Sequence, residues 1–421
     1  MIKQILKIIW AQRKSNGWIY AELVLVLCVL WLLADISYVD LRTYYSPLGY
    51  DITNTWRFKL SKLNPQSPAY VPEEAYTSDP ASDLLQLTSQ IRQNPMVDAV
   101  CITYYSCPYS FGNSWVNIRP VDGDTLLASQ ESFQVRRVTK EYFDVFSVKD
   151  VEGNSITAQL EGLVNPIVIT KDMEKEFFHD QSGRGRKIRY EHGGEEMLIA
   201  AVSTPIRTDE FVKSAPAFYT VATDSQLNSL IESFGADQAE LCVRMKQTLS
   251  QNEMNNFLEE MGDRLTVNNL NVYGVRAIAD IRKQLLKNRE ADRIKRSVVM
   301  GFLLVNVFFG IIGTFWLRTQ HRRGETGIRI ALGANRFTLK AGLYGEGLCL
   351  LLLTLPFTLL FMINMQAMDM LDTYRQAYTL LRFLATFGGT YLIMGAMICL
   401  GIWFPVQKTS RIAPAEALHY E

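Results

Sequence analysis

Four long apolar segments constrain this 421-residue chain more than any other feature of its sequence. They are residues 18–36, 298–317, 347–365 and 383–403. A helix rises 1.5 Å per residue, so about 20 apolar residues cross a hydrocarbon core of about 30 Å. The last three segments carry no charge, and the first carries only Glu22 before its acidic end at Asp35. The sequence therefore predicts four transmembrane helices, with a kink in the third at Pro356.

The first 17 residues are basic and patterned. Apolar residues fall on one helical face at Ile2, Ile5, Leu6 and Ile9. This pattern is typical of an amphipathic helix that lies in the membrane interface, so we interpret 1–17 as a cytoplasmic leader. A cleaved signal peptide is the alternative, but the stretch LLADISY lacks a clear cleavage site, and we expect an uncleaved anchor.

Lys and Arg are distributed unevenly around the spans. They crowd the leader, the loop 318–346 and the tail 404–421, whereas the loop 366–382 has only Arg375 and Arg382. The positive-inside rule then places both termini and the loop 318–346 in the cytoplasm. A basic cluster within 287–296 disagrees, but it belongs to a very long segment, where the rule is weak.

The long segment 37–297 is expected to be one extracytoplasmic domain. Strand patterns occur at 97–105, 114–121, 133–138, 166–170, 197–202 and 217–222, and helix patterns at 83–92, 171–178, 225–232 and 251–262. Strands mixed with helices predict an α+β domain. The expected architecture is thus membrane α-helical, one span before the domain and three after it in a 1+3 arrangement.

The residues Gly274–Arg296 form a helical pattern that runs into the second span without a breaker. One interpretation is a stalk helix that carries motion between the membrane and the outer domain. The other is a helix that only packs on its own domain, and the sequence favours neither.

Three of the six cysteines fall in the expected outer domain, at Cys101, Cys107 and Cys242. Outside the cytoplasm disulfides persist, so a disulfide between Cys101 and Cys107 is a candidate. One cysteine is left over, and spacing alone does not decide the pairing.

Catalytic motifs are absent from the sequence. The four histidines make no HExxH motif, and there is no GxSxG or GxxxxGK[ST] stretch, so we expect no enzyme, no metal site and no nucleotide bound by this chain. The zero formal net charge argues against nucleic-acid binding. Within the spans, Glu22 and Asn306 are polar, and we interpret them as a residue that reaches the interface and one that hydrogen-bonds across helices.

A short charged helix is predicted between the second and third spans. Glu325 precedes Arg329 by four residues, the favourable order for an ion pair, and lies near the helix N-terminus, where negative charge is stabilising. Gly333 can end the helix in the left-handed conformation. The apolar face consists of Ile328, Ala331 and Leu332.

The stretch GETGIRIALGA at 324–334 resembles the EIGIR(K/M)A(L/V)GA signature of MacB-like and FtsX-like ABC transporter permeases. In that signature a second Glu opens the next span, where Glu346 stands, and Thr326 replaces an Ile. The tail FPVQKTSRIAPAEALHYE resembles the family ending PAxRAARLxPxEALRxE, with His419 in place of an Arg. Two outer stretches, VTKEYFDVF and NPIVITKDMEKEFF, resemble the family more loosely.

The resemblance implies a membrane subunit without a fused ATPase, in a bacterial inner membrane. A cytoplasmic ABC ATPase would bind ATP and Mg, and a second permease subunit would complete a homo- or heterodimer. A periplasmic adaptor and an outer-membrane component are further partners that the family uses, beside membrane lipid. The ATPase-coupling residues would be Glu325, Gly327, Ile328, Arg329, Ala331, Leu332, Gly333 and Glu346.

Three functions stay open on the sequence. The first is export or extraction of peptides, lipoproteins or toxic compounds by transmitted motion. The second is FtsX-like activation of cell-wall hydrolases, without a transported substrate. The third is a membrane-tethered sensor that has no ATPase.

Overall fold

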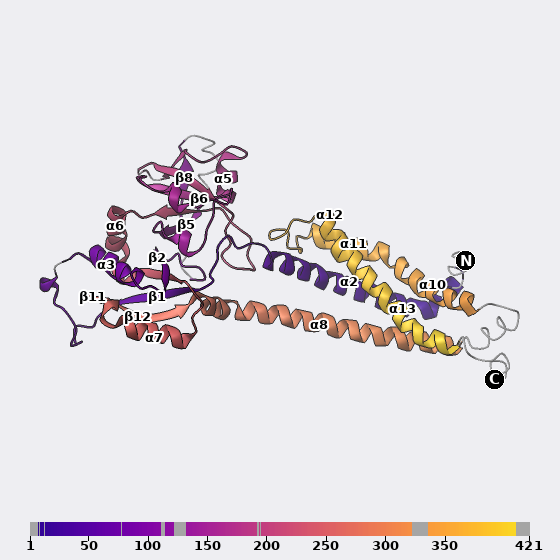
Figure 1. The fold of residues 1–421 in the computed structure, drawn as a ribbon. Helices are drawn as coiled ribbons and strands as arrows, with labels where there is room; N and C mark the ends of the chain where they lie inside the picture. The colour runs from indigo at the N-terminus through magenta and orange to yellow at the C-terminus, as the bar shows by residue number, and fades with distance from the viewer. Residues whose placement is uncertain are drawn as a thin grey trace. The chain divides into compact units, whose positions relative to one another are not determined.

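The computed structural model describes residues 7, 9–11, 13–76, 78–110, 114–121, 132–191, 193, 195–321 and 336–409 (Figure 1). The chain divides into two compact units. One unit consists of Met1–Tyr45 and Asn288–Glu421 and is called the membrane unit below. The other unit, Ser46–Lys287, is called the sheet domain.

The membrane unit is helical. Its elements are α2 (Arg13–Tyr44), α8 (Ile278–His321, shared with the sheet domain), α10 (Arg336–Leu353), α11 (Leu355–Ala367), α12 (Leu380–Phe383), a π-helical turn (Leu384–Gly388) and α13 (Gly389–Thr409). Four segments of the described helices are long and apolar enough to cross a membrane, namely Gly17–Tyr44, Ile278–Gly313, Lys340–Ala367 and Leu380–Trp403. Three of these segments contain the predicted spans 18–36, 347–365 and 383–403, and Ile278–Gly313 overlaps the predicted span 298–317.

The helices of the membrane unit share an apolar core. Leu27 of α2, Ile311 of α8, Leu350 of α10 and Ile398 of α13 all lie in it. Helix α13 approaches α8 closely at Gly401, where a Cβ atom would lie 2.8 Å from a methyl group of Ile311. A small residue is therefore required at this contact between two spans.

The third span is broken where the sequence predicts a kink. Helix α10 ends at Leu353, and Pro356 lies in the first turn of α11. The hydroxyl groups of Thr354 and Thr358 lie 3.0 Å and 2.6 Å from the hydroxyl of Tyr391 in α13. These hydrogen bonds satisfy polar groups at the break, which lipid alone would not do.

A single mixed sheet forms the sheet domain. Its strands are β1 (Thr55–Lys62), β2 (Val97–Tyr104), β3 (Trp115–Val116), β4 (Ile118–Pro120), β5 (Phe133–Val138), β6 (Pro166–Thr170), β7 (Lys187–Tyr190), β8 (Met197–Ser203), β9 (Ala217–Val221), β10 (Glu240–Met245), β11 (Thr266–Val267) and β12 (Leu270–Ala277). The order is β11-β12-β1-β10-β2-β5-β9-β6-β8-β7-β4, with β3 beside β5. The pairs β5–β9 and β6–β8 are parallel and the others antiparallel.

Helices cover parts of this sheet. They are α3 (Pro80–Arg92), α4 (Tyr142–Val145), α5 (Lys171–Phe178), α6 (Asp224–Phe234) and α7 (Gln251–Met261), with four short 3-10 turns at Glu73–Ala75, Thr157–Gln159, Ala236–Gln238 and Gly262–Leu265. The start of α7 is fixed by a reciprocal pair, in which Ser250 accepts from the backbone of Glu253 and the Glu253 carboxylate accepts from Ser250 N–H. The expected α+β class is therefore present.

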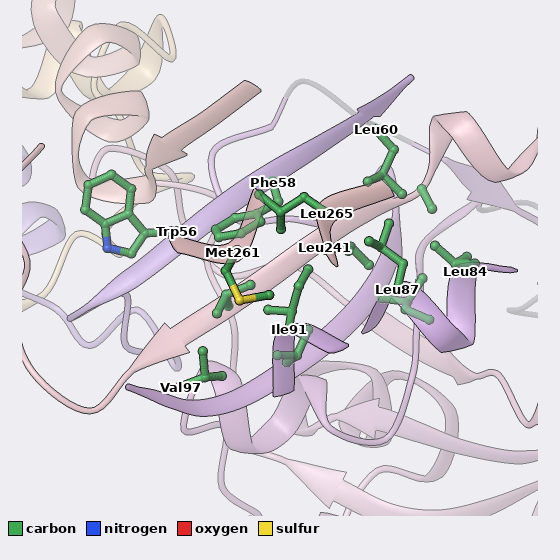
Figure 2. Close-up of a cluster of buried hydrophobic side chains, with 14 of the residues drawn as sticks. Trp56, Phe58, Leu60, Leu84, Leu87, Ile91, Val97, Leu241, Met261 and Leu265 are labelled. Carbon is green, nitrogen blue, oxygen red and sulfur yellow. The ribbon is translucent and has the colours of Figure 1, made fainter. Parts of the chain in front are cut away.

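The sheet has two halves with separate apolar cores. The core of the first half lies among β1, β2, β10, α3 and α7, and Figure 2 shows Phe58, Leu87 and Leu241 within it. The core of the second half contains Ile169, Phe177 and Phe218. Strands β2 and β5 pair at two positions, Thr103 with Val138 and Tyr104 with Arg137, and α4 adds contacts of Tyr142 and Phe143 with Tyr219 of β9.

The predicted stalk helix needs one correction at its start. The helical pattern was expected from Gly274, but Gly274–Ala277 belong to β12, and α8 begins at Ile278. In β12 these residues pair with Trp56–Lys59 of β1, so tertiary pairing overrides the local helical pattern. From Ile278 the helix continues through Leu317 without interruption, as expected.

Candidate functional site

Most residues of the expected ATPase-coupling site lie outside the described residues. These are Glu325, Gly327, Ile328, Arg329, Ala331, Leu332 and Gly333. The eighth, Glu346, lies in α10 and is buried, with 4% of its surface exposed. It lies one turn before Leu350, which belongs to the core of the membrane unit. The coupling role of all eight residues stays a prediction.

The two polar residues noted within the spans have simple environments. Asn306 donates to the carbonyl oxygen of Phe302 in its own helix at 2.8 Å, not to another helix as expected. Glu22 is exposed, and its Oε1 lies 3.0 Å from where a Cβ atom of Gly310 would stand. Neither residue forms part of a buried polar cluster.

A buried ion pair joins α2 to α12. The guanidinium of Arg382 donates to both oxygens of Asp35, from Nε at 2.9 Å and from Nη2 at 2.5 Å. Its Nη1 donates to the carbonyl oxygens of Asp372 and Gln376 at 2.9 and 2.6 Å. Arg382 is 0% and Asp35 1% exposed, so this bidentate pair is fully shielded from solvent.

A second cluster of charges lies one to two turns further along α2. The carboxylate of Asp40, 3% exposed, accepts from Arg375 at 2.8 Å and from Arg296 of α8. Arg375 also donates to Asp372 at 2.5 Å. Burial alone would lower the pKa of Arg375, but its two carboxylate partners raise it. Burial alone would raise the pKa of Asp372, but the hydrogen bonds and charge of Arg375 lower it.

These two clusters, called the ion-pair network below, consist of Asp35, Asp40, Arg296, Asp372, Arg375 and Arg382. They connect α2, α8, α12 and the loop between α11 and α12 at one end of the spans. The guanidinium of Arg293 stacks 4.6 Å from the ring centre of Tyr44 and adds a contact between α8 and α2. Because buried charges are costly without partners, the network holds these elements in one arrangement.

The sequence contains a signal for this network. Asp35 is the acidic end of the first predicted span, and Arg382 is the last residue of the loop 366–382. Each stands at the border of an apolar segment, and intramembrane charges of opposite sign are expected to pair. The two residues are 347 positions apart, so only the folded structure identifies them as partners.

A cavity of about 380 Å³ opens in the sheet domain. Its lining includes Arg92, Val100, Ile102, Glu141 and Leu163. The guanidinium of Arg92 lies 3.5 Å from Glu141 and donates to the carbonyl oxygen of Val100 at 3.1 Å. The volume lies in the range of small-molecule sites, and the lining combines apolar side chains with a few polar groups.

The three cysteines of the sheet domain are buried free thiols. Cys242 of β10 pairs with Cys101 of β2 in the sheet register, and its thiol interacts with those of both Cys101 and Cys107. Burial raises the pKa of the Cys107 thiol and that of the Cys242 thiol well above the ordinary value for cysteine, so both thiols stay protonated. The expected Cys101–Cys107 disulfide stays a prediction, and Cys242 is a partner that spacing did not reveal.

The described residues contain no group of three or more His, Cys, Asp or Glu side chains that could hold a metal ion. The basic turn at Gly183–Gly185 leads into β7, as a surface loop would, and Gly185 adopts a φ of +82°. The ion-pair network described above connects helices of the membrane unit.

Comparison with known proteins gave no match to any family model and no match among curated proteins. Solved structures do match, 26 chains in all. The periplasmic region of MacB from Actinobacillus actinomycetemcomitans is 14% identical at a TM-score of 0.34, over 59% of this chain and 98% of that one. The extracellular domain of the noncanonical ABC-type transporter YknZ from Gram-positive bacteria is 17% identical at 0.29, over 52% and 100%.

A permease-type protein from Porphyromonas gingivalis contributes a third domain, 14% identical at a TM-score of 0.34, over 55% of this chain and 92% of that one. At these identities the likeness concerns the fold. The chain is similar to the periplasmic region of MacB, to the extracellular domain of the ABC-type transporter YknZ and to a domain of a permease-type protein, and its stretches 324–334 and 404–421 resemble motifs of the MacB-like and FtsX-like ABC transporter permeases.

Proposed function

We propose that this chain is the membrane subunit of an ABC transporter or mechanotransmission complex. A separate cytoplasmic ATPase binds ATP and Mg, and its hydrolysis cycle moves the sheet domain outside the membrane. The chain itself catalyses no reaction and binds no cofactor. Its cargo is a peptide, a lipoprotein or a toxic compound that is exported or extracted.

The continuity of α8 is the observation that carries this proposal. The helix begins directly after β12, a strand paired with β1 in the sheet, and ends at His321, three residues before the motif at 324–334. Each turn is hydrogen-bonded to the next, so a helix resists bending and transmits a displacement along its length. A force applied at the motif therefore reaches the sheet domain through one element.

The ion-pair network supports the same mechanism. Arg296 of α8 contacts Asp40 of α2, and Asp40 contacts Arg375 of the loop before α12. A movement of α8 is thus shared with α2 and with the loop, because separating buried charges is costly. The network thereby restricts movement of these helices relative to one another in the lipid.

The composition of the spans favours transmission of motion over passage of cargo. A conduit needs polar groups that face a water-filled path. Among the described span residues, Asp35 and Arg382 are paired with each other, and Asn306 is bonded to its own helix. Glu22 contacts Gly310, and Glu346 is buried one turn before the core residue Leu350. Cargo is therefore handled by the sheet domain, where the cavity of about 380 Å³ is a candidate contact site.

The proposed setting is a bacterial inner membrane, with both termini and the motif in the cytoplasm. A second permease subunit, identical or different, completes the complex. Only 11% of the most apolar stretch of the second span is buried within the chain. Helix α8 therefore leaves a wide apolar surface for this subunit or for lipid. A periplasmic adaptor and an outer-membrane component are further proposed partners.

An FtsX-like regulator of cell-wall hydrolases is the alternative function. It needs the same ATPase and the same rigid α8 but no cargo, and the scarcity of polar groups among the described span residues agrees with it equally. The two functions differ in what binds the sheet domain. A sensor without an ATPase is less favoured, because the motif at 324–334 would then have no partner.

The proposal is tested by breaking α8 at Asn288, an exposed position. Proline costs about 3 kcal/mol in a helix interior and kinks the helix, whereas alanine at the same position keeps it straight. We expect Asn288→Pro to copurify with the ATPase but to lose cellular function, and Asn288→Ala to behave as wild type. Full function of the proline variant, or ATP-dependent passage of cargo into sealed vesicles, would contradict the mechanism.

A further inference from the structure

Arg136 is a buried cation in the middle of the sheet domain. It lies in β5, which pairs with β9, and only 7% of its surface is exposed. Alternate residues of a strand point to the same face, so Arg136 shares its face with Gln134. Both line a small cavity beside the turn that follows β2.

The guanidinium of Arg136 makes few contacts for its burial. It has five N–H donors. Its Nη1 approaches the hydroxyl of Tyr142 at a long 3.4 Å, and its Nε is buried without any hydrogen-bond partner. The ring of Tyr219 lies beneath it at 5.9 Å, a cation–π contact that compensates part of the burial cost.

Another buried arginine of the same domain has a fuller set of acceptors. Arg207 is 4% exposed, and it donates to three carbonyl oxygens, those of Val212 at 2.8 Å, Ser46 at 2.5 Å and Glu210 at 2.5 Å. Arg136 has no comparable set of acceptors. Its donors are therefore available to a ligand.

The positive charge of Arg136 also lacks a counter-ion. No described carboxylate lies within ion-pair distance of it. Glu210 reaches the cavity wall only through Tyr109: its Oε1 accepts from Tyr109 at 2.9 Å and from Arg282 at 2.5 Å, and its Oε2 is buried without a hydrogen-bond partner. Burial raises the pKa of Tyr142 well above its ordinary value and that of Tyr219 to about 12, so both phenols are neutral.

The cavity beside Arg136 has a volume of about 20 Å³. A water-sized species needs about 10–15 Å³ measured in this way, so the space admits one small group. The wall is formed by Tyr50, Tyr105, Ser106, Cys107, Pro108, Tyr109, Ser110, Gln134 and Thr208. It holds no carboxylate that would repel an anion.

We propose that Arg136 and this cavity form a binding site for one small monovalent anion, either a chloride ion or a carboxylate group. A neutral water molecule could accept from Nε, but it would leave the buried charge uncompensated. An anion supplies both an acceptor and the opposite charge. Because the cavity lies next to the joint between β2 and β5, the bound anion stabilises the contact between the two halves of the sheet.

The site is tested on the full-length chain in lipid nanodiscs. The midpoint of thermal unfolding is measured in two series at constant ionic strength. Chloride replaces the bulkier isethionate in the first series, and formate replaces it in the second. A ligand that binds only the folded state raises the midpoint with the logarithm of its concentration once that concentration exceeds the Kd. A response to chloride alone assigns a halide site, and a response to formate alone assigns a carboxylate site.

Two variants and a diffraction measurement decide the result. We expect Arg136→Gln to lose the anion response and Arg184→Gln, at an exposed arginine of the same domain, to keep it. If Arg136→Gln does not fold, wild-type crystals grown with bromide provide the test instead. Bromide gives an anomalous diffraction signal, and its peak should lie beside Arg136 Nε. An absent response in wild type, a response retained in Arg136→Gln, or a water in place of bromide would each overturn the proposal.

Discussion

Replacement of Asp35 by Asn should strongly destabilise the membrane unit. Arg382 is fully buried and makes four hydrogen bonds, two of them to the Asp35 carboxylate. The variant keeps the two bonds to backbone carbonyls but leaves the guanidinium charge without its counter-ion. Breaking a buried pair in this way costs about 3–5 kcal/mol.

The expected cost converts into a measurable shift in melting temperature. One kcal/mol corresponds to about 2–4 °C for a unit of 150–250 residues, so the midpoint should fall by roughly 6–20 °C. The assay is the loss of helical circular dichroism on heating the full-length chain in lipid nanodiscs. Asp369→Asn is the matched control, because Asp369 is exposed in the loop between α11 and α12. The midpoint of this variant should equal that of the wild type.

A double variant separates the cost of a lone charge from the worth of the pair. Asp35→Leu with Arg382→Met removes both charges and leaves apolar side chains of similar size. Such replacements are often neutral, so the double variant should melt well above Asp35→Asn. The reasoning is refuted if Asp35→Asn melts with wild type, or if the double variant is no more stable than the single one.

Three further outcomes are expected. Arg329→Glu should abolish copurification of the ATPase while the membrane level of the chain stays normal. Arg322→Glu, outside the motif, should not affect copurification. If both variants retain equal amounts of the ATPase, Arg329 has no coupling role. A cysteine placed at Asn335 should resist a membrane-impermeant thiol reagent in intact spheroplasts and react after lysis, and labelling before lysis would reverse the proposed topology. Diamide should leave Cys101, Cys107 and Cys242 as free thiols in the folded chain, because burial keeps Cys107 and Cys242 protonated, and a Cys101–Cys107 disulfide found by peptide mass spectrometry would support the sequence-based pairing instead.

Elements with strong local signals could be predicted from the sequence. The four apolar segments are helices, and the run Phe133–Val138 forms β5 with the expected bounds. The kink at Pro356 follows from the missing N–H of proline and is present. In each of these cases local chemistry decides the structure.

Other elements depend on contacts that no local pattern contains. Strand β1 was not predicted, although Trp56, Phe58 and Leu60 alternate with polar residues, a signal that could have been used. Gly274–Ala277 read as helix but pair with β1, a partner about 200 positions away. The pairing of Asp35 with Arg382 likewise needs the folded chain.

The narrow connection between β2 and β5 has a consequence for local unfolding. Amide hydrogen exchange reports cooperative blocks that open separately when few contacts join them. Thr103 and Tyr104 of β2 pair with Val138 and Arg137 of β5, and each half has its own apolar core. Helix α4 also joins the halves, because it packs on β2 and β10 while Tyr142 and Phe143 contact the ring of Tyr219 in β9. The protection of the amides at the β2–β5 joint should therefore depend on α4 as well as on the two strand pairs.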